Sequence, residues 1–219
     1  MPKRVWRGIA AKRFWAIPAC GLLAACTFTV PIKPVFEEPP LFPQIQARVG
    51  SACRIAIHKA DYFENSGGEG GVFHVDFDRA SQTRFEQVFQ SLFAEVTPLP
   101  PWPPWRETPP DLDGVIELDA AELKASLGDD MGRSYEQVVV EYRVCLYSVD
   151  GATIGCWESR AEQKHQRAMF ERFTMPSYLG TLVEATSREA IARFMLAFEA
   201  DPAVMDWAGQ VARRSDVQP

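Results

Sequence analysis

Histidines, cysteines and acidic residues are the side chains of this sequence that could bind a metal or carry out catalysis. The three histidines, His58, His74 and His165, lie far apart, and no HxxxH or CxxC pair is present. The sequence also lacks the GxSxG motif of a serine hydrolase and the GK[ST] ending of a phosphate-binding loop. Two pairs of adjacent acidic residues lie in segments predicted as loops. We therefore expect no metal, no cofactor and no enzymatic activity.

The N-terminus has the features of an export signal. Basic residues precede an apolar stretch, Phe14 to Ala25, which is too short to span a bilayer core of about 30 Å comfortably. The stretch ends in Leu23-Ala24-Ala25-Cys26. This ending resembles the lipobox of bacterial lipoproteins, in which the cysteine receives a diacylglycerol thioether and a peptidase cuts before it. The resemblance implies that 1–25 is a signal peptide and that Cys26 is lipidated.

The residue after Cys26 bears on the membrane to which the chain would be anchored. In enterobacterial lipoproteins an Asp at this position resembles an inner-membrane retention signal, and this chain has Thr27. We therefore expect a lipid anchor at the periplasmic face of the outer membrane, where two or more acyl chains hold stably. The alternative is an uncleaved signal anchor in which Cys26 is an ordinary cysteine.

The rest of the chain divides into a tether, one domain and a tail. Residues 26–48 begin with the lipidated cysteine and contain five prolines, which break helices and favour an extended chain of about 3.1 Å per residue. We expect a single α/β domain over 49–212 and a frayed tail over 213–219. The body is acidic once the basic N-terminus is removed, so nucleic acid is not expected as a partner.

The strongest local signal is a β-hairpin. Two runs of alternating residues, 135–148 and 152–160, flank Asp150-Gly151, a dipeptide suited to a two-residue type I′ turn. With that turn, paired residue numbers sum to 301. The pairs are then Cys145 with Cys156, Arg143 with Glu158, and Val144 with Trp157. In an oxidising compartment Cys145 and Cys156 could form a disulfide and leave Cys53 over; the alternative is three buried free thiols.

The most unusual segment is residues 98–110, in which seven of thirteen residues are proline. In a polyproline II conformation Trp102 and Trp105 project from the same face. Exposed, the two rings would form a contact surface for a peptide, a glycan or a partner subunit. Buried, they would close the end of the core.

Apolar periodicity predicts the remaining elements. It gives strands at 51–58, 73–77 and 113–118, a helix over 79–96 capped by Asp78, a loop at 124–134, a helix capped by Thr186 or Ser187 that could extend N-terminally from Leu179, and a short helix at 205–211. This order favours an α+β fold. We expect a mixed or mainly antiparallel sheet with a long hairpin, covered on one face by two amphipathic helices.

Joined to the lipobox, this element order resembles small periplasm-facing accessory lipoproteins, such as curli-type secretion and transporter-auxiliary lipoproteins. The resemblance implies a non-enzymatic accessory or scaffold subunit of a cell-envelope transport or assembly complex, with protein partners and a membrane anchor. One alternative is a binding module for lipid, glycan or peptide, which requires an apolar pocket with a polar rim. Another is a cell-wall enzyme, which requires titratable groups that converge in a cleft.

Overall fold

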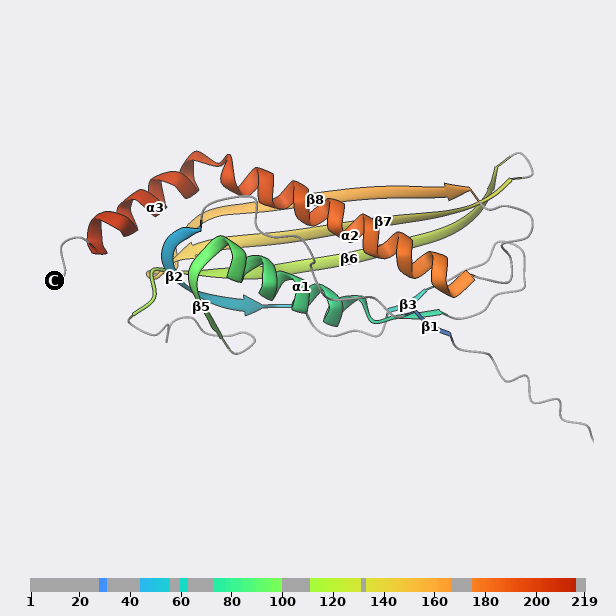
Figure 1. Cartoon of the computed structure of the whole chain (residues 1–219), viewed down its shortest axis with the longest axis horizontal. Coiled ribbons are helices and arrows are strands. Elements are labelled where there is room, and N and C mark those ends of the chain that lie inside the picture. The colour runs from blue at the N-terminus through green and yellow to red at the C-terminus, as the bar shows by residue number, and fades with distance from the viewer. Residues whose placement is uncertain are drawn as a thin grey trace, which may run out of the picture.

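The computed structural model describes residues 28–30, 44–55, 60–62, 73–99, 111–130, 133–166 and 175–215. A five-stranded mixed sheet and a layer of helices on one of its faces make up the body (Figure 1). The strand order is β5 (Phe93–Pro98), β2 (Ile45–Cys53), β6 (Gly114–Asp130), β7 (Arg133–Ser148) and β8 (Thr153–Gln166). Strand β2 runs parallel to β5 and β6, and the pairings of β7 are antiparallel. The prediction of an α+β fold is confirmed.

Three described helices form the second layer. Helix α1 (Phe77–Leu92) packs over β5, β6 and β2, and α2 (Met175–Glu199) packs over β7 and β8. Helix α3 (Pro202–Ser215) contacts β2 and β8; it confirms the short helix predicted at 205–211 and extends beyond it at both ends. A small second sheet is formed by β1 (Phe28–Val30), β4 (Phe73–Val75) and β3 (Ala60–Tyr62). Over the described part of the chain, no helix is both long and apolar enough to cross a membrane.

The predicted register of the long hairpin is confirmed. Cys145 pairs with Cys156, Arg143 with Glu158 and Val144 with Trp157. The predicted two-residue turn is wrong. The Gly151 N–H donates to the Ser148 carbonyl (2.9 Å) at a φ of 86°, and the Ser148 N–H donates to the Ala152 carbonyl (2.9 Å). These bonds close a three-residue loop, and a bulge between Leu146 and Tyr147 restores the register further along the strands.

The loop expected at 124–134 is also wrong. Strand β6 continues to Asp130 and pairs with β7 up to the Asp130–Arg133 pair. Gly128 and the two aspartates after it suggested a turn, but apolar pairs such as Leu123 with Val140 hold the strand in the sheet. A register shift between Leu118 and Ala120 lets both halves of β6 keep an apolar face toward the helices.

Helix α1 is shorter than the predicted helix over 79–96. It ends at Leu92, and Phe93 to Pro98 form strand β5 beside β2. Phe93 continues the helical spacing in the sequence, yet its ring packs on Phe198 and Trp207 from the extended strand. The predicted cap is wrong as well. The helix begins at Phe77, so Asp78 lies in the first turn, where a carboxylate interacts favourably with the helix dipole.

Helix α2 runs without a break through the residues expected to cap it. The predicted N-terminal extension from Leu179 is confirmed, and the cap at Thr186 or Ser187 is wrong. Both hydroxyls donate to carbonyls one turn earlier, at Leu182 and Val183, each at 2.7 Å. Both hydroxyls thus have hydrogen-bond partners inside the helix, and neither accepts from the free backbone N–H groups of a helix start as a cap would.

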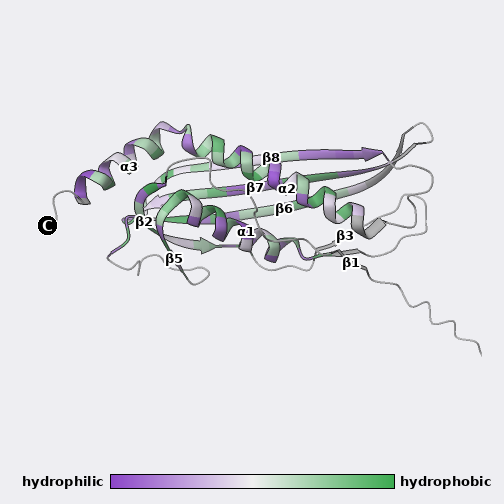
Figure 2. Cartoon of the chain, viewed as in Figure 1, coloured by the Kyte–Doolittle hydropathy of each residue, from purple (hydrophilic) through white to green (hydrophobic). Residues whose placement is uncertain are grey.

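Strand β2 begins at Ile45, earlier than the strand expected at 51–58 and within the segment expected as a tether. Its inward residues Ala47 and Val49 are buried in the core, so this half of the strand belongs to the sheet. Strand β1 likewise falls within the expected tether and pairs with β4. In Figure 2 the arrowhead end of β8 has the colour of hydrophilic residues.

Candidate functional site

A cavity of about 500 Å³ opens between helix α1 and the sheet, where strand β5 ends. Its volume lies within the range of about 300–1,000 Å³ that is usual for ligand pockets. Most of the lining is apolar and comes from Ala52, Ile55, Phe85, Phe89, Pro98, Leu99 and Leu118. The remaining lining residues are Ser51, Cys53, Gln82 and Glu86.

The back wall of the cavity is part of the protein core. Phe85 and Phe89 lie one turn apart on the same face of α1, with their ring centroids separated by 5.6 Å. The ring of Phe85 also meets Tyr142 of β7 edge-on at 4.9 Å and Phe194 of α2 at 5.7 Å. These contacts hold the Phe85 ring from the side of β7 and α2, so this part of the wall is rigid.

The opposite wall is held by backbone hydrogen bonds on both sides of β2. The Leu99 N–H donates to the Ser51 carbonyl (2.7 Å), and the Arg54 N–H donates to the Leu118 carbonyl (3.0 Å). Gly50 permits the close approach of Leu99, because a Cβ at that position would lie 2.5 Å from the Leu99 Cδ1. The strand that carries Cys53 is therefore fixed at the edge of the cavity.

The thiol of Cys53 is the most reactive type of group in the cavity lining. Burial raises the pKa of this thiol, and the carboxylates of Glu86, Glu117 and Asp78 raise it further, against a hydrogen bond with the backbone of Ile55 that lowers it. The thiol therefore stays protonated at neutral pH, and it behaves as a small apolar group and a weak nucleophile.

The other two cysteines of the body form a disulfide. Cys145 and Cys156 are joined across β7 and β8, at the pair that the hairpin register places opposite each other, and Cys53 is free. The bond lies on the sheet face that points away from the helices, because Val144 and Trp157 beside it point into the core. It joins the two strands of the predicted hairpin near their turn.

A buried carboxylate lies on that same face. The Glu117 side chain is 1% exposed and accepts two hydrogen bonds from the Arg54 guanidinium, both at 3.2 Å. Arg54 also contacts Asp119 at 3.1 Å, and Asp119 contacts Arg143 at 3.3 Å. Burial raises the pKa of Glu117 even though Arg54 opposes that shift. This network ties the end of β2 to β6 and β7.

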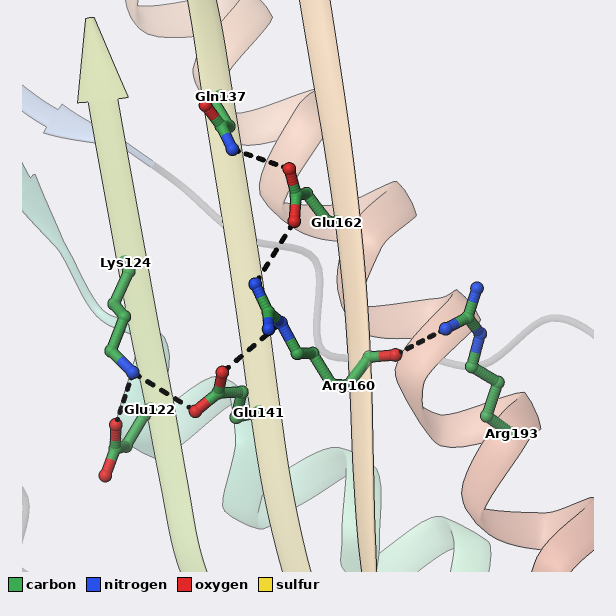
Figure 3. Close-up of polar contacts among 7 residues, drawn as sticks. All are labelled: Glu122, Lys124, Gln137, Glu141, Arg160, Glu162 and Arg193. Atoms are coloured by element: carbon green, nitrogen blue, oxygen red, sulfur yellow. Dashed lines mark hydrogen bonds and ion pairs between the residues drawn. The ribbon is translucent and has the colours of Figure 1, made fainter.

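Further along the same face, polar side chains form a row across three strands, which we call the charge ladder (Figure 3). Its members are Glu122, Lys124, Gln137, Glu141, Arg160 and Glu162. Lys124 contacts Glu122 and Glu141, both at 3.1 Å, and Arg160 contacts Glu141 at 3.4 Å and Glu162 at 3.2 Å. The five charged members on β6 to β8 alternate in sign along the chain of contacts. The ladder therefore presents both charges and does not favour a polyanion.

Helix α2 also reaches the strand that carries the ladder. Arg193 of α2 donates to the backbone carbonyl of Arg160 at 2.7 Å (Figure 3). The same guanidinium contacts Glu189, one helical turn away, at 2.6 Å. The position of β8 relative to α2 is thus set at a second point, outside the apolar core.

The sequence-predicted site residues fall into two groups. Cys26, Trp102 and Trp105 lie outside the described residues, while Cys145 and Cys156 are brought together as predicted. Of the histidines, His58 lies outside the described residues and His165 stacks on Tyr178 at 5.2 Å. Within the described segments, no three potential metal ligands come together.

Sequence reasoning missed the cavity. Its residues were assigned correctly to a strand and to the apolar face of a helix, but the cavity depends on β5 ending beside β2. The predicted helix over 79–96 included the first residues of β5, so no strand was predicted there. A usable signal was Pro98, because proline is expected at the end of an edge strand rather than in a sheet centre.

Comparisons with known proteins find solved structures that are similar to this chain over part of the fold. No family model and no curated protein matches the chain. A Xanthomonas campestris protein of the DUF330 family superposes with a TM-score of 0.43 at 9% identity, over 88% of this chain and 99% of that one. A neuraminyllactose-binding hemagglutinin homolog from Helicobacter pylori gives 0.44 at 11% identity, over 84% and 96%. A minor lipoprotein from Acinetobacter baumannii gives 0.36 at 7% identity, over 69% and 96%. At these identities no residue role carries over to this chain.

Proposed function

We propose that this chain is an exported lipoprotein, anchored through Cys26 at the periplasmic face of the outer membrane. There it serves as a non-enzymatic accessory or scaffold subunit of a cell-envelope transport or assembly complex. The observation that carries the proposal is the disulfide between Cys145 and Cys156. Disulfides persist in oxidising compartments and are rare in the cytosol, and the lipobox ending at Cys26 directs a chain to such a compartment.

The chemistry at the cavity supports the non-enzymatic part of the proposal. Among the lining residues, the thiol of Cys53 is kept protonated by burial, and Glu86 is an exposed carboxylate. A general acid and base need two titratable groups within reach of one reacting atom. The cavity lining offers a site for binding rather than for proton transfer.

The helix-free face of β6 to β8 supports the accessory role. None of the described helices covers this face, and the charge ladder leaves its side chains 34–61% exposed. Exposed charges of both signs add little to stability, at about 0.2–1 kcal/mol for each pair. They do set the specificity and orientation of an approaching partner with complementary charges.

Lipidation is tested by metabolic labelling with radioactive palmitate in a Gram-negative host. The wild-type chain is expected to take up label and to lose residues 1–25. Cys26→Ala is expected to remain unlabelled and uncleaved. Cys20→Ala is the matched control, because it removes a cysteine of the same segment and leaves the lipobox intact. Label retained in Cys26→Ala would contradict the anchor.

The accessory role is tested by site-specific photo-crosslinking in intact cells. A photoreactive amino acid at Arg160, in the charge ladder, is expected to crosslink to a subunit of a membrane transport or assembly complex. The same amino acid at Leu196, on the exposed side of α2, is the control and is expected to give no such product. A mature lipoprotein that gives no adduct at Arg160 and extracts as a monomer would contradict the role.

A further inference from the structure

We propose that the cavity between α1 and β2 binds a single acyl or alkyl chain whose polar end is uncharged or cationic. This binding site is independent of the anchor at Cys26 and of the accessory role proposed above.

The walls fit a hydrocarbon. The apolar lining comes from Phe85 and Phe89 of α1, from Leu118 and Ile55 on the sheet side, and from Leu99 after β5. The thiol of Cys53 among them is protonated and adds no charge. A glycan or a nucleotide needs many convergent donors and acceptors, and the described lining offers few. An apolar chain needs only contact and the exclusion of water.

The polar groups of the lining include two neighbours on α1. Gln82 and Glu86 lie one turn apart, and the Gln82 amide approaches the Glu86 carboxylate at 3.5 Å. Gln82 is half-buried and Glu86 is exposed, so this pair marks the side of the cavity that meets solvent. A hydroxyl or an ammonium group at that point can donate to the Glu86 carboxylate.

The charge around the cavity selects against an anionic head group. Glu86 is the charged side chain of the described lining, and its carboxylate gives the rim a negative field. A carboxylate or phosphate head group would meet this negative field, and like charges brought together in a partly desolvated site repel. The same field favours a neutral or a positively charged end.

The test is photolabelling of the full mature lipoprotein in phosphatidylcholine vesicles. The probes are a medium-chain alcohol with a diazirine in its chain, the matching amine and the matching carboxylic acid. Adducts are located by mass spectrometry. The alcohol and the amine are expected to label the peptides around Phe85, Phe89 and Leu99, and the acid about tenfold less at equal aqueous concentration, which corresponds to about 1.4 kcal/mol.

Two variants on α1 separate specific binding from partition into the membrane. Gln82→Trp fills the cavity and is expected to abolish labelling of these peptides. Gln90→Trp is the matched control, because Gln90 is exposed on the same helix and does not line the cavity. Circular dichroism checks that both variants fold. Equal labelling in Gln82→Trp and Gln90→Trp would overturn the proposal.

A third variant tests the charge selection without filling the cavity. Glu86→Gln is expected to raise labelling by the acid several-fold and to leave labelling by the alcohol within about twofold. Labelling by the acid that equals labelling by the alcohol in the wild-type chain would overturn the head-group assignment. Because all of these readouts are adduct positions within the cavity, they are unaffected by whether a partner complex is present.

Discussion

At the scale of single residues, Asp201 links a strand, a turn and a helix through one carboxylate. One oxygen accepts the Trp157 indole N–H at 3.0 Å, and the other accepts the Ala203 N–H at 2.8 Å at the start of α3. An N-cap contributes about 0.5–2 kcal/mol, and a hydrogen bond to a charged group about 1.5–3 kcal/mol. The side chain therefore stabilises both the start of α3 and the position of Trp157.

The loss of stability on substituting Asp201 should depend on how many of its two hydrogen bonds the new side chain keeps. We expect Asp201→Ala to lower the free energy of unfolding by about 2–3 kcal/mol, because both bonds are lost. Asp201→Asn keeps one acceptor oxygen and should cost about 1 kcal/mol. Urea denaturation followed by tryptophan fluorescence measures both values. Equal losses in the two variants would show that only one of the two bonds stabilises the fold.

Glu117 gives a prediction for pH. Burial raises its pKa in the folded chain, so the folded state holds a proton that the unfolded state has already released. The contribution of Glu117 to stability is therefore fully present below its unfolded pKa of about 4.3 and is lost as the pH rises through its folded pKa. Glu117→Gln removes this loss. The free energy of unfolding of Glu117→Gln, minus that of the wild-type chain, should therefore increase from pH 4 to pH 7 in denaturation curves. A difference that stays constant or decreases would contradict the raised pKa of Glu117.

At the scale of elements, two glycines test how closely the helices pack on the sheet. A Cβ on Gly114 of β6 would lie 2.7 Å from the Tyr147 carbonyl and 3.1 Å from the Trp207 ring of α3. A Cβ on Gly209 of α3 would find its nearest neighbour at 3.7 Å. The first position is filled by backbone and a buried ring, and the second has room.

Alanine at these two positions should therefore act in opposite directions. Gly114→Ala should lower the free energy of unfolding by about 1–3 kcal/mol, because both the Tyr147 carbonyl of β7 and the Trp207 ring of α3 must move away. Gly209→Ala should raise it by up to about 1 kcal/mol, because alanine favours the helix. Thermal unfolding followed by circular dichroism compares the two. A loss in Gly209→Ala as large as that in Gly114→Ala would mean that α3 packs differently.

The elements that the sequence predicted best are those with two independent signals. The hairpin combined an Asp-Gly turn with alternation on both flanks, and its pairing at Cys145 and Cys156 was confirmed although the turn type was not. The register survived because a bulge near Leu146 compensates for the extra loop residue. Cross-strand packing of Val144 on Trp157, rather than turn chemistry, sets the pairing.

The elements that the sequence predicted poorly carry one signal each. Phe93 and Val96 continue the helical spacing of α1, yet tertiary pairing with β2 makes them a strand. Gly128 indicated a loop, but the long antiparallel pairing with β7 overrides that local preference. Thr186 and Ser187 resemble caps, and the continuous apolar face of α2 on β8 keeps them helical.

At the scale of the whole molecule, the site and the core cannot be separated. The cavity exists because β5 ends early beside β2 while α1 stays in place above them. That arrangement depends on contacts between elements far apart in the sequence, such as Phe85 of α1 with Phe194 of α2. No local pattern encodes such a contact, so the residues of the cavity were predictable as core positions and not as a site.

The same long-range contacts predict how the whole molecule unfolds. Phe194 is fully buried and touches Phe85, Trp157 and Phe198, so it joins α1, α2 and the sheet. Phe194→Ala should lower the free energy of unfolding by about 3–5 kcal/mol. Leu196→Ala, at a 60% exposed position two residues along the same helix, should change it by less than about 0.5 kcal/mol.

Because one aromatic core joins all the layers, Phe194→Ala should also keep a single unfolding transition at a lower denaturant concentration. Tryptophan fluorescence includes the signals of Trp157 and Trp207 in the core, and far-ultraviolet circular dichroism reports on the helices. Coincident midpoints by both probes are expected for the wild-type chain and for both variants. Separate midpoints in Phe194→Ala would mean that α2 and its strands unfold independently of the cavity side, and the rigidity of the cavity's back wall would then not follow from the core.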